Sequence, residues 1–554
     1  MKAHLLYRDQ DFDLQRKLPW NEEALTQDLA LKTLLSAMTR DDQFVFEVAQ
    51  KVIFFGLDNN LETIRHRQAV LQDCLSQSAV IRELYAVGVE AVARAKKHYL
   101  GALARDPEWV LRLSIELMET FLGMIKKLRE ITDLHADSFL SEGWTEFFSM
   151  VKRELSDDYL AGVEYHLEQL KFRKGALLSA QLGKGNKGSR YILRLPPSPE
   201  GNWLTRLFTE QPLSYSFSIH PRDESGSRAL GALQNRGISS AANALAQAAD
   251  HVSSFFSMLR TELAFYVGCV NLHEDLFQKG ARTCFPSPAV ADERRLSFRG
   301  LYDASLALSL DQRVVGNDVD ADKQDLVIVT GANQGGKSTF LRSIGLAQLM
   351  MQSGMFVPAD SFDSSICDGL FTHYKREEDT TMKSGKLDEE LGRMSDIINH
   401  ITPHAMMLFN ESFAATNERE GSEIARQILS ALLEKRVKMV CVTHLYELAR
   451  GFCETNLGNV LFLRAERQAD GVRTFKLIEG EPLQTSFGED LYKSIFGVVI
   501  APDGGQQFKD ANERRIAKVI GPNVGVLLSS VQNGREYERN GPDGKASARS
   551  SVAE

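Results

Sequence analysis

The sequence predicts two successive regions of different fold class, an α-helical region up to about residue 285 and an α/β region over residues 295–500. Three observations lead to this prediction. Apolar residues recur at helical spacing through most of the first region. Short apolar runs alternate with helical segments in the second, which is typical of a mostly parallel sheet covered by helices. A glycine-rich loop at residues 331–338 lies between a predicted strand and a predicted helix.

The helical periodicity is clearest in five segments of the first region. In each, apolar residues at helical spacing alternate with polar faces. These segments cover residues 25–38, 44–55, 61–75, 108–131 and 239–277. We therefore expect one helical domain over residues 1–285.

A basic insertion over residues 171–221 interrupts this helical region. Gly, Pro and Ser are more concentrated in it than in the rest of the first region, and residues 190–195 and 213–219 alternate like strands. Its basic residues concentrate in two runs, with Lys171, Arg173 and Lys174 in the first and Lys184, Lys187 and Arg190 in the second. Such a loop could clamp a phosphodiester backbone, or it could be an exposed hairpin tip with ordinary solubilising charges. The sequence favours neither interpretation.

The second region reads as alternating strands and helices. Buried strands are predicted at residues 326–330, 405–409 and 437–442, and helices at residues 340–347 and 423–433. Residues 460–463 and 474–478 look like a hairpin that turns at Asp470-Gly471. Beyond residue 501 the chain is polar, and we expect a largely disordered tail over residues 501–554.

The glycine-rich loop has the spacing of a phosphate-binding loop. Glycines let backbone N–H groups turn toward phosphate oxygens, and the positive end of the following helix adds to the attraction. Lys337 would reach the β- and γ-phosphates of ATP, and the Ser338 hydroxyl would ligate Mg²⁺. The residues expected to contact the nucleotide are Gly331, Ala332, Asn333, Gln334, Gly335, Gly336, Lys337, Ser338 and Thr339.

Polar residues follow the next two predicted strands. Asn410 and Glu411 end one strand, where nucleotide hydrolases carry an acidic pair that serves magnesium and the attacking water. Asn410 contributes no charge, so we expect weaker metal affinity, with Glu411 as the general base. His444 ends the other strand and could reach the γ-phosphate or the water. The alternatives are a helix N-terminus capped by Asn410 or Ser412, and a cap or a backbone-satisfied edge histidine at His444.

A run of mixed charge occupies residues 373–390 between the loop and Asn410. Such a run is normally a solvated face. Within it, Ser384-Gly385 precedes a helix expected to start near Leu387, and a helix N-terminus is a potential anion site.

Composition limits the remaining classes of function. The net charge of −9 argues against indiscriminate binding of polyanions but not against a local basic surface. No segment approaches the ~20 consecutive apolar residues of a membrane helix, and the amino terminus lacks the apolar core of a secretory signal. The six cysteines show no paired metal spacing. We therefore expect a cytoplasmic protein with free thiols.

Several of these motifs together resemble the MutS family of DNA mismatch-repair ATPases. The loop, with Asn and a doubled Gly before Lys337, is similar to the family's phosphate loop. Residues 315–319, 354–359 and 443–448 also resemble the family, in the same order and spacing. The resemblance implies a helical core and lever domain followed by an ABC-type ATPase domain. It also implies a homodimer with ATP held between the phosphate loop of one chain and Ser384 of the other, and long helices leading to a DNA channel.

The chain departs from the family pattern in ways that affect its expected function. No mixed α/β reader domain and no Phe-x-Glu wedge precede the helical region, and no nuclease domain follows the ATPase. A helical dimerisation extension is at best reduced to residues 508–519. Because Asn410 replaces the usual Asp, we expect slow hydrolysis.

The leading hypothesis is a dimeric, ATP-gated DNA clamp or switch in DNA repair or recombination. An ATP-gated interaction protein without a DNA role is the alternative, favoured by the acidic charge and the missing reader domain. A chromosome-structure or transporter-type ATPase ranks last, because long coiled coils and a glycine-glycine signature are not visible in the sequence.

Overall fold

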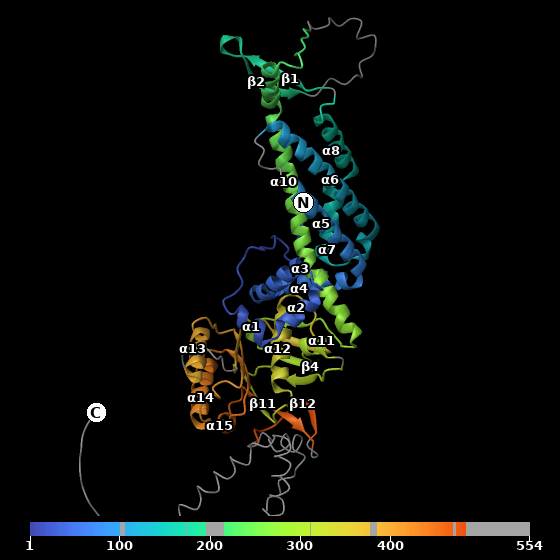
Figure 1. Ribbon diagram of the computed structural model, residues 1–554. Helices are drawn as coiled ribbons and strands as arrows, with labels where there is room; N and C mark the ends of the chain where they lie inside the picture. Colours follow the sequence, from blue (N-terminus) through green and yellow to red (C-terminus); the bar gives the residue numbers. More distant parts are fainter. Residues whose placement is uncertain are drawn as a thin grey trace, which may run out of the picture.

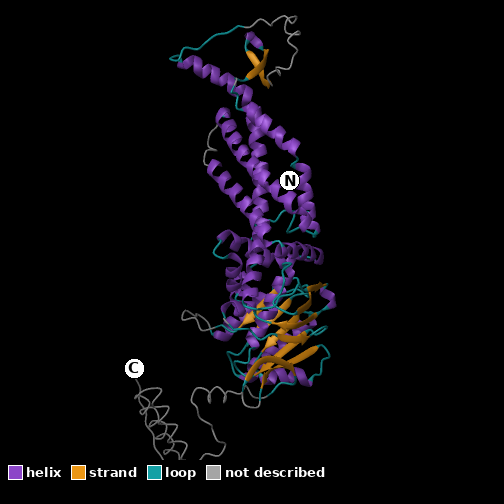
Figure 2. Ribbon diagram, turned by 90° about the vertical axis from the view of Figure 1, so that its right-hand side faces the viewer, coloured by secondary structure: helices purple, strands orange, loops and turns teal. Residues whose placement is uncertain are grey.

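The computed structural model describes residues 1–99, 106–173, 175–194, 215–310, 312–376, 385–468 and 472–483. The molecule is elongated, with a helical stalk between a small β-hairpin at one end and two β-sheets at the other (Figures 1 and 2). The described chain therefore combines helices with mixed sheets.

Eight helices precede the hairpin in the described chain, and their apolar faces share one core. The predicted segments at residues 44–55, 61–75 and 108–131 each correspond to one of them. Their bounds are α1 (Glu22–Asp28), α2 (Leu31–Thr39), α3 (Gln43–Phe55), α4 (Leu61–Ser76), α5 (Ser78–Tyr99), α6 (Pro107–His135), α7 (Glu142–Glu154) and α8 (Asp157–Leu170).

The prediction of one helix over residues 25–38 was wrong. Ala30 adopts a φ of 52°, so α1 ends at Asp28 and α2 begins at Leu31. A left-handed residue cannot continue a right-handed helix. The apolar spacing continues across this break, which is why the sequence pattern did not reveal it.

The long helix α10 (Glu224–Gln278) runs from the hairpin to the sheets and packs along α5 and α6 (Figure 1). It begins well before residue 239, the start expected from periodicity. Asp223 caps its first turn by accepting a hydrogen bond of 2.8 Å from the Gly226 N–H. The apolar pattern is weak over its first turns because α10 there projects beyond the core, and its buried residues start only at Gly237.

The hairpin at the far end of the stalk consists of β1 (Leu177–Leu182) and β2 (Gly188–Arg194), paired antiparallel. The strand predicted at residues 190–195 is therefore present as far as Arg194. The strand predicted at residues 213–219 was wrong for its described part, since residues 215–219 have no regular secondary structure. Its aromatic residues lie in solvent, with Tyr215 89% and Phe217 82% exposed, so no packing surface holds it as a strand.

The larger sheet has six strands in the order β12-β11-β6-β10-β9-β8. Five run parallel and β12 runs antiparallel to β11, which confirms the two strands of the predicted hairpin and the three predicted buried strands. The turn predicted at Asp470-Gly471 lies outside the described residues. The strands are β6 (Leu326–Gly331), β8 (Leu370–Tyr374), β9 (Met406–Asn410), β10 (Lys438–Val442), β11 (Val460–Arg467) and β12 (Arg473–Glu479). Val442 of β10 pairs with Asn410 on one side and Val329 on the other, so these carboxyl ends lie side by side.

Helices cover both faces of this sheet. Alternate residues of β6 belong to different cores: Val327 and Val329 face the core shared with the stalk, whereas Leu326 and Ile328 face a second core. The stalk side is covered by α12, and the other side by α13, α14 and α15. These helices are α12 (Lys337–Gln352), α13 (Lys386–Ile398), α14 (Glu418–Glu434) and α15 (Tyr446–Glu454).

A second sheet of four strands, in the order β3-β7-β4-β5, joins the stalk to the larger sheet. No strand of it was predicted individually, because its strands are short and lie between loops. The short helix α11 follows β4. The bounds are β3 (Ser287–Ala289), β4 (Leu296–Leu301), α11 (Ala304–Ser309), β5 (Asn317–Asp320) and β7 (Ser361–Ser365).

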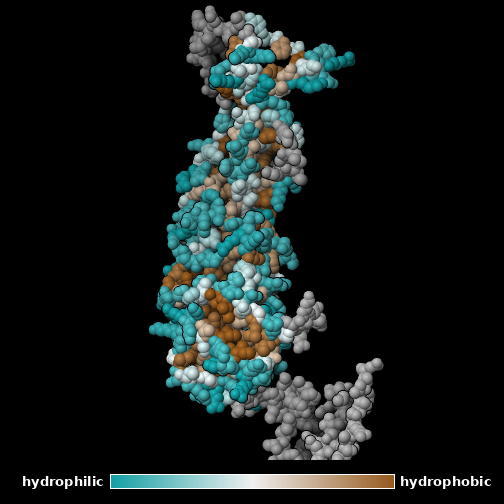
Figure 3. Space-filling model, turned by 90° about the vertical axis from the view of Figure 1, so that its left-hand side faces the viewer, coloured by the Kyte–Doolittle hydropathy of each residue, from teal (hydrophilic) through white to brown (hydrophobic). Residues whose placement is uncertain are grey.

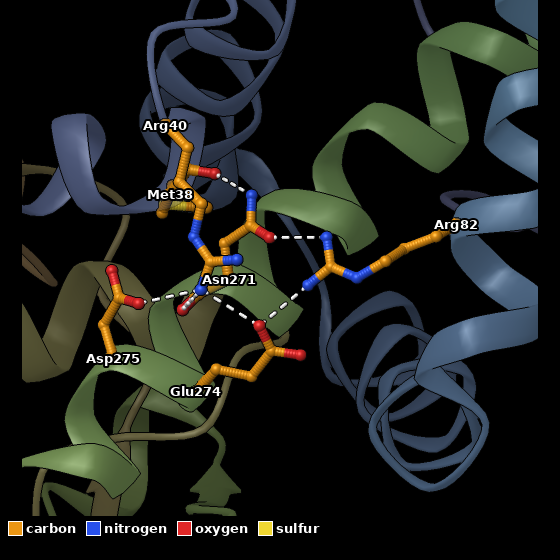
Figure 4. A network of polar contacts seen from close by, with 6 residues as sticks. All are labelled: Met38, Arg40, Arg82, Asn271, Glu274 and Asp275. Atoms are coloured by element: carbon orange, nitrogen blue, oxygen red, sulfur yellow. Dashed lines mark hydrogen bonds and ion pairs between the residues drawn. The ribbon is translucent and has the colours of Figure 1, made fainter.

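A polar network fixes the end of α10 that meets the sheets (Figure 4). Asn271 is only 4% exposed; its amide donates to the Met38 carbonyl at 2.8 Å and accepts from Arg82 at 2.7 Å. Arg40 and Arg82 both donate to the Glu274 carboxylate, at 2.9 and 2.8 Å. The network therefore ties α2 and α5 to the foot of α10.

The surface differs between the stalk and the sheet region. On the face drawn in Figure 3, hydrophilic residues predominate along the stalk, whereas hydrophobic residues gather in one area of the sheet region. None of the described helices combines the length and apolar character needed to span a bilayer.

Candidate nucleotide-binding site

The glycine-rich loop connects the end of β6 to the start of α12, as the sequence predicts. Gly331 has a φ of 110°, and a Cβ there would lie 2.8 Å from the Ala465 backbone nitrogen. Gly336 has a φ of 87° immediately before the first helical residue. Both positions require glycine because L side chains rarely adopt these angles. The turn directs the free N–H groups of the first turn of α12 toward the carboxyl edge of the sheet.

Lys337 lies folded back over the loop. Its ammonium donates to the carbonyls of Gly331 at 2.9 Å and Ala332 at 3.1 Å, and the residue is 5% exposed. Burial lowers the pKa of Lys337, the carboxylate of Glu411 opposes this effect, and the charge of Arg473 adds to it. The loop therefore holds a buried cation against its own carbonyl dipoles.

Ser338 and Asn410 are in direct contact. The Ser338 hydroxyl donates a hydrogen bond of 2.9 Å to Oδ1 of Asn410. The two residues come from the first turn of α12 and the end of β9, and 72 positions separate them in the chain. They bring two neutral oxygen ligands together at the edge of the sheet.

Glu411 follows Asn410 in an unusual backbone conformation, with a φ of 53°. Its N–H donates to the Val442 carbonyl at 2.9 Å, which holds the residue between β9 and β10. Non-glycine residues with positive φ are uncommon and are often found at functional sites. Its carboxylate lies 3.9 Å from Nδ1 of His444, with side chains 30% and 40% exposed.

A cavity of ≈ 610 Å³ opens beside these groups. Its volume lies within the range of about 300–1,000 Å³ that is usual for ligand pockets. The predicted residues among its lining are Asn333, Gln334, Gly335, Gly336, Lys337, Ser338, Thr339 and Glu411. Gly331, Ala332, Asn410 and His444 do not line it, but they contact residues that do.

The motifs in the sequence did not predict the residues that line the rest of this cavity. They include Tyr302, Val315, Asn317 and Phe475. Asn317 accepts a hydrogen bond of 2.7 Å from the Leu477 N–H and donates one of 3.3 Å to the Phe475 carbonyl. These bonds fix β12 against β5 and place Phe475 over the loop. Residues 315–319 were noted only for their resemblance to the MutS family, and Phe475 gave no signal.

Gly385 lies outside the nucleotide cavity. It is the N-cap of α13, and α13 packs against β8, the edge strand of the large sheet. Gly385 does not line the cavity of its own chain. Ser384 lies outside the described residues.

The mixed-charge run that contains Gly385 is not a solvated face throughout. His373 and Glu390, at its two ends, are 0% and 1% exposed. His373 makes hydrogen bonds of 2.8 Å with the Ser412 hydroxyl and 3.0 Å with the Glu390 carbonyl. The edge strand β8 pairs with β9 and packs against α1 and α13, so all its residues are buried whatever their polarity. A pattern of charges in the sequence does not reveal such packing.

Comparison with known families identifies both halves of the chain. Residues 59–279 match the family described as MutS2 N-terminal domain, and residues 327–496 match the family described as MutS domain V. The chain belongs to the MutS family. Domain V is the family's ATPase domain, and its match includes the loop, Asn410, Glu411 and His444.

Curated proteins that are named MutS or MutS2 match this chain at modest sequence identity. DNA mismatch repair protein MutS of Leptospira interrogans is 32% identical over 209 residues, 36% of this chain and 24% of the relative. MutS of Parabacteroides distasonis is 33% identical over 168 residues, 29% of this chain and 19% of the relative. Endonuclease MutS2 of Lacticaseibacillus casei is 31% identical over 216 residues, 37% of this chain and 27% of the relative. The aligned part thus spans about a quarter of each relative or less.

Proposed function

We propose that this chain binds and hydrolyses ATP at the glycine-rich loop and uses the nucleotide to control DNA binding as a homodimer. The observation that carries the proposal is the contact between Asn410 and Ser338, a residue that lines the cavity together with Lys337 and Glu411. A phosphate-binding loop, a metal-ligand pair and a carboxylate then meet at one edge of the sheet.

The residues present fit MgATP. The cavity volume of ≈ 610 Å³ accommodates a nucleotide, and the first turn of α12 supplies N–H groups for its phosphates. Mg²⁺, when bound, neutralises charge on the β- and γ-phosphates. Ser338 and Asn410 would hold it, Asn410 through a bound water. On the far wall, Val315 and Phe475 offer apolar surface for a planar base.

Each polar group around the phosphates would have a different role in ATP binding and hydrolysis. Lys337 would donate to the β- and γ-phosphates in place of its bonds to the loop carbonyls. Glu411 would accept the proton of the attacking water, and His444 would orient that water or contact the γ-phosphate. Because Asn410 adds no charge, metal binding is weak and turnover slow.

Dimerisation would complete the site. We propose that Ser384 and Gly385, at the start of α13, contact the γ-phosphate bound by a second copy. Two observations support a partner on this side of the molecule. Gly385 is at the N-terminus of α13, a helix on the side of the molecule drawn in Figure 3, and this helix exposes Leu391 (38%) and Ile398 (51%). Apolar surface of this kind is typical of protein interfaces.

The hairpin end of the stalk is the proposed DNA contact. Lys184, Lys187 and Arg190 are exposed there, at the far end of α10 from the nucleotide site. Exposed basic side chains bind the DNA backbone through phosphate contacts and counterion release. The long helix α10 joins this end to the sheets, so a nucleotide-dependent shift at its foot would be transmitted to the tip.

The alternative function is an ATP-gated interaction protein without direct DNA binding, which the net charge of −9 favours. One experiment separates the two. We expect duplex or branched DNA to bind with an affinity that changes with ATP, and Lys184→Ser/Lys187→Ser to weaken binding and lower its salt slope by about two. The control Lys96→Ser/Lys97→Ser removes two exposed lysines from the stalk.

DNA binding that is absent with and without ATP, measured by fluorescence anisotropy, would favour the alternative. ATP hydrolysis is measured separately. Lys337→Ala should abolish it, whereas Lys323→Ala, an exposed lysine outside the cavity, should not.

A further inference from the structure

A second cavity, of ≈ 390 Å³, lies behind one wall of the nucleotide cavity. The two cavities share Tyr302 and residues 312–315 as a common wall. On its other side, the second cavity is lined by Lys279 and Arg282, in the loop that follows the last residue of α10. It therefore lies between the foot of the long helix and the nucleotide site, and its volume is within the usual range for small ligands.

The lining of this cavity is strongly basic. Lys279, Arg282, Arg313 and Lys476 contribute four positive charges, and the only acidic residues of the lining are Asp318 and Asp360. This excess of two positive charges occurs in a chain whose net charge is −9. Charges of one sign that gather around a concave surface attract counter-ions of the opposite sign.

The acidic groups do not neutralise the lining. Asp318 accepts a hydrogen bond of 2.6 Å from the Gly300 N–H, which commits one of its oxygens to the loop. Asp360 forms an ion pair of 3.3 Å with Arg282, which leaves the charges of Lys279, Arg313 and Lys476 against that of Asp318. Arg313 makes no ion pair with a side chain of the described residues, and it lines both cavities. Its guanidinium suits the planar, bidentate recognition of phosphate or carboxylate oxygens.

The backbone around the cavity is held in place. The Tyr302 hydroxyl donates to the Arg282 carbonyl at 2.9 Å, and Lys476 donates to the Gly316 carbonyl. A Cβ on Gly316 would lie 2.4 Å from the Gly300 carbonyl oxygen, so these two loops approach as closely as glycine allows. The segments that carry Arg282 and Lys476 are therefore held against the loops around the cavity.

We propose that this cavity is a binding site for a small phosphate-bearing molecule, distinct from the nucleotide site. Arg313 and Lys476 would bind its phosphate from the side of the nucleotide cavity, and Lys279 and Arg282 from the foot of α10. The bound molecule would tie the long helix to the wall of the nucleotide site. This site does not depend on the proposed ATPase function.

The test is calorimetric titration with inorganic pyrophosphate in a Lys337→Ala background, which removes the lysine of the phosphate loop. We expect one binding site per chain, weakened by added salt. Adding Arg282→Gln and Arg313→Gln should lower the affinity at least about tenfold. The matched control adds Arg299→Gln and Lys323→Gln, which remove two exposed charges outside the cavity and should leave the affinity unchanged.

Three results would overturn the proposal. The first is an absence of pyrophosphate binding in the Lys337→Ala background. The second is an equal loss of affinity in the control, which would indicate general electrostatic attraction. The third is displacement of pyrophosphate by a duplex oligonucleotide, which would assign these cations to DNA. Since Arg282 and Arg313 are both exposed, their replacement should leave the fold intact, and circular dichroism checks this.

Discussion

The Ser338 hydroxyl lies 2.9 Å from Oδ1 of Asn410, so the expected magnesium ligands are already in contact through a hydrogen bond between two neutral groups. An aspartate at position 410 would accept the same hydrogen bond and add a negative charge. The geometry of the site would then be unchanged and only its electrostatics altered. A substitution at position 410 therefore tests the effect of charge on metal affinity separately from the effect of geometry.

Asn410→Asp should raise the apparent Mg²⁺ affinity of nucleotide binding by about tenfold, equivalent to ~1.4 kcal/mol. A water-mediated contact moderates the attraction that a direct charge pair would give. Magnesium titration of nucleotide affinity measures the effect. Asn456→Asp, an exposed change of the same charge outside the cavity, should have no effect. Identical titrations for wild type and Asn410→Asp would show that residue 410 does not serve the metal.

Glu411→Gln should slow hydrolysis by at least about a hundredfold while leaving ATP binding intact. The amide keeps the size of the side chain but cannot accept the proton of the attacking water. If ATP is shared between two copies, this variant should accumulate as an ATP-bound dimer in size-exclusion chromatography with light scattering. Glu447→Gln, an exposed change on α15, serves as the control. A Glu411→Gln protein that stays monomeric with ATP would argue against the shared site.

The sequence predicted those parts of the fold that local pattern determines. β6, β9 and β10 were found because both faces of these strands are buried, which produces continuous apolar runs. The glycine-rich loop was found because its backbone angles require glycine at positions 331 and 336. The roles of Glu411 and His444 stay predictions, although the two side chains lie 3.9 Å apart as their strand order implied.

The parts that were missed depend on contacts between distant residues. Asn317 fixes Phe475 across 158 positions, and no local pattern encodes that bond. The break at Ala30 leaves the apolar spacing intact, so periodicity continued through it. β1 was missed because most of its residues are exposed on both faces and its side chains do not alternate in polarity.

Glu262 should make the stability of the protein depend on pH. Burial raises the pKa of this fully buried carboxyl to about 7, although the N–H groups of Leu5 and Leu6 donate to it at 2.6 and 3.2 Å. Between its ordinary value of 4.5 and about 7, the folded protein keeps a proton that the unfolded chain has lost. Stability therefore falls as pH rises through this window, by about 3 kcal/mol at most.

Glu262→Gln should remove this dependence, because the amide oxygen can accept the same two hydrogen bonds without ionising. Melting temperatures measured at about pH 5 and pH 8 should differ less for the variant than for wild type. Glu434→Gln, at an exposed position of α14, should follow wild type. Parallel curves for all three proteins would mean that Glu262 does not titrate in this range.

Asn271→Leu should destabilise the foot of α10 by about 2–3 kcal/mol. Leucine has nearly the same shape, but it leaves the Met38 carbonyl without its donor and removes one of the two acceptors of Arg82, which keeps Glu274, in a site where Asn271 is 4% exposed (Figure 4). Arg228→Ala in the same helix breaks an exposed pair with Glu224, with side chains 78% and 83% exposed, and should cost less than about 0.5 kcal/mol. Thermal unfolding of both variants distinguishes a buried amide that anchors the long helix from an exposed surface pair. Equal losses of stability would refute that anchoring role.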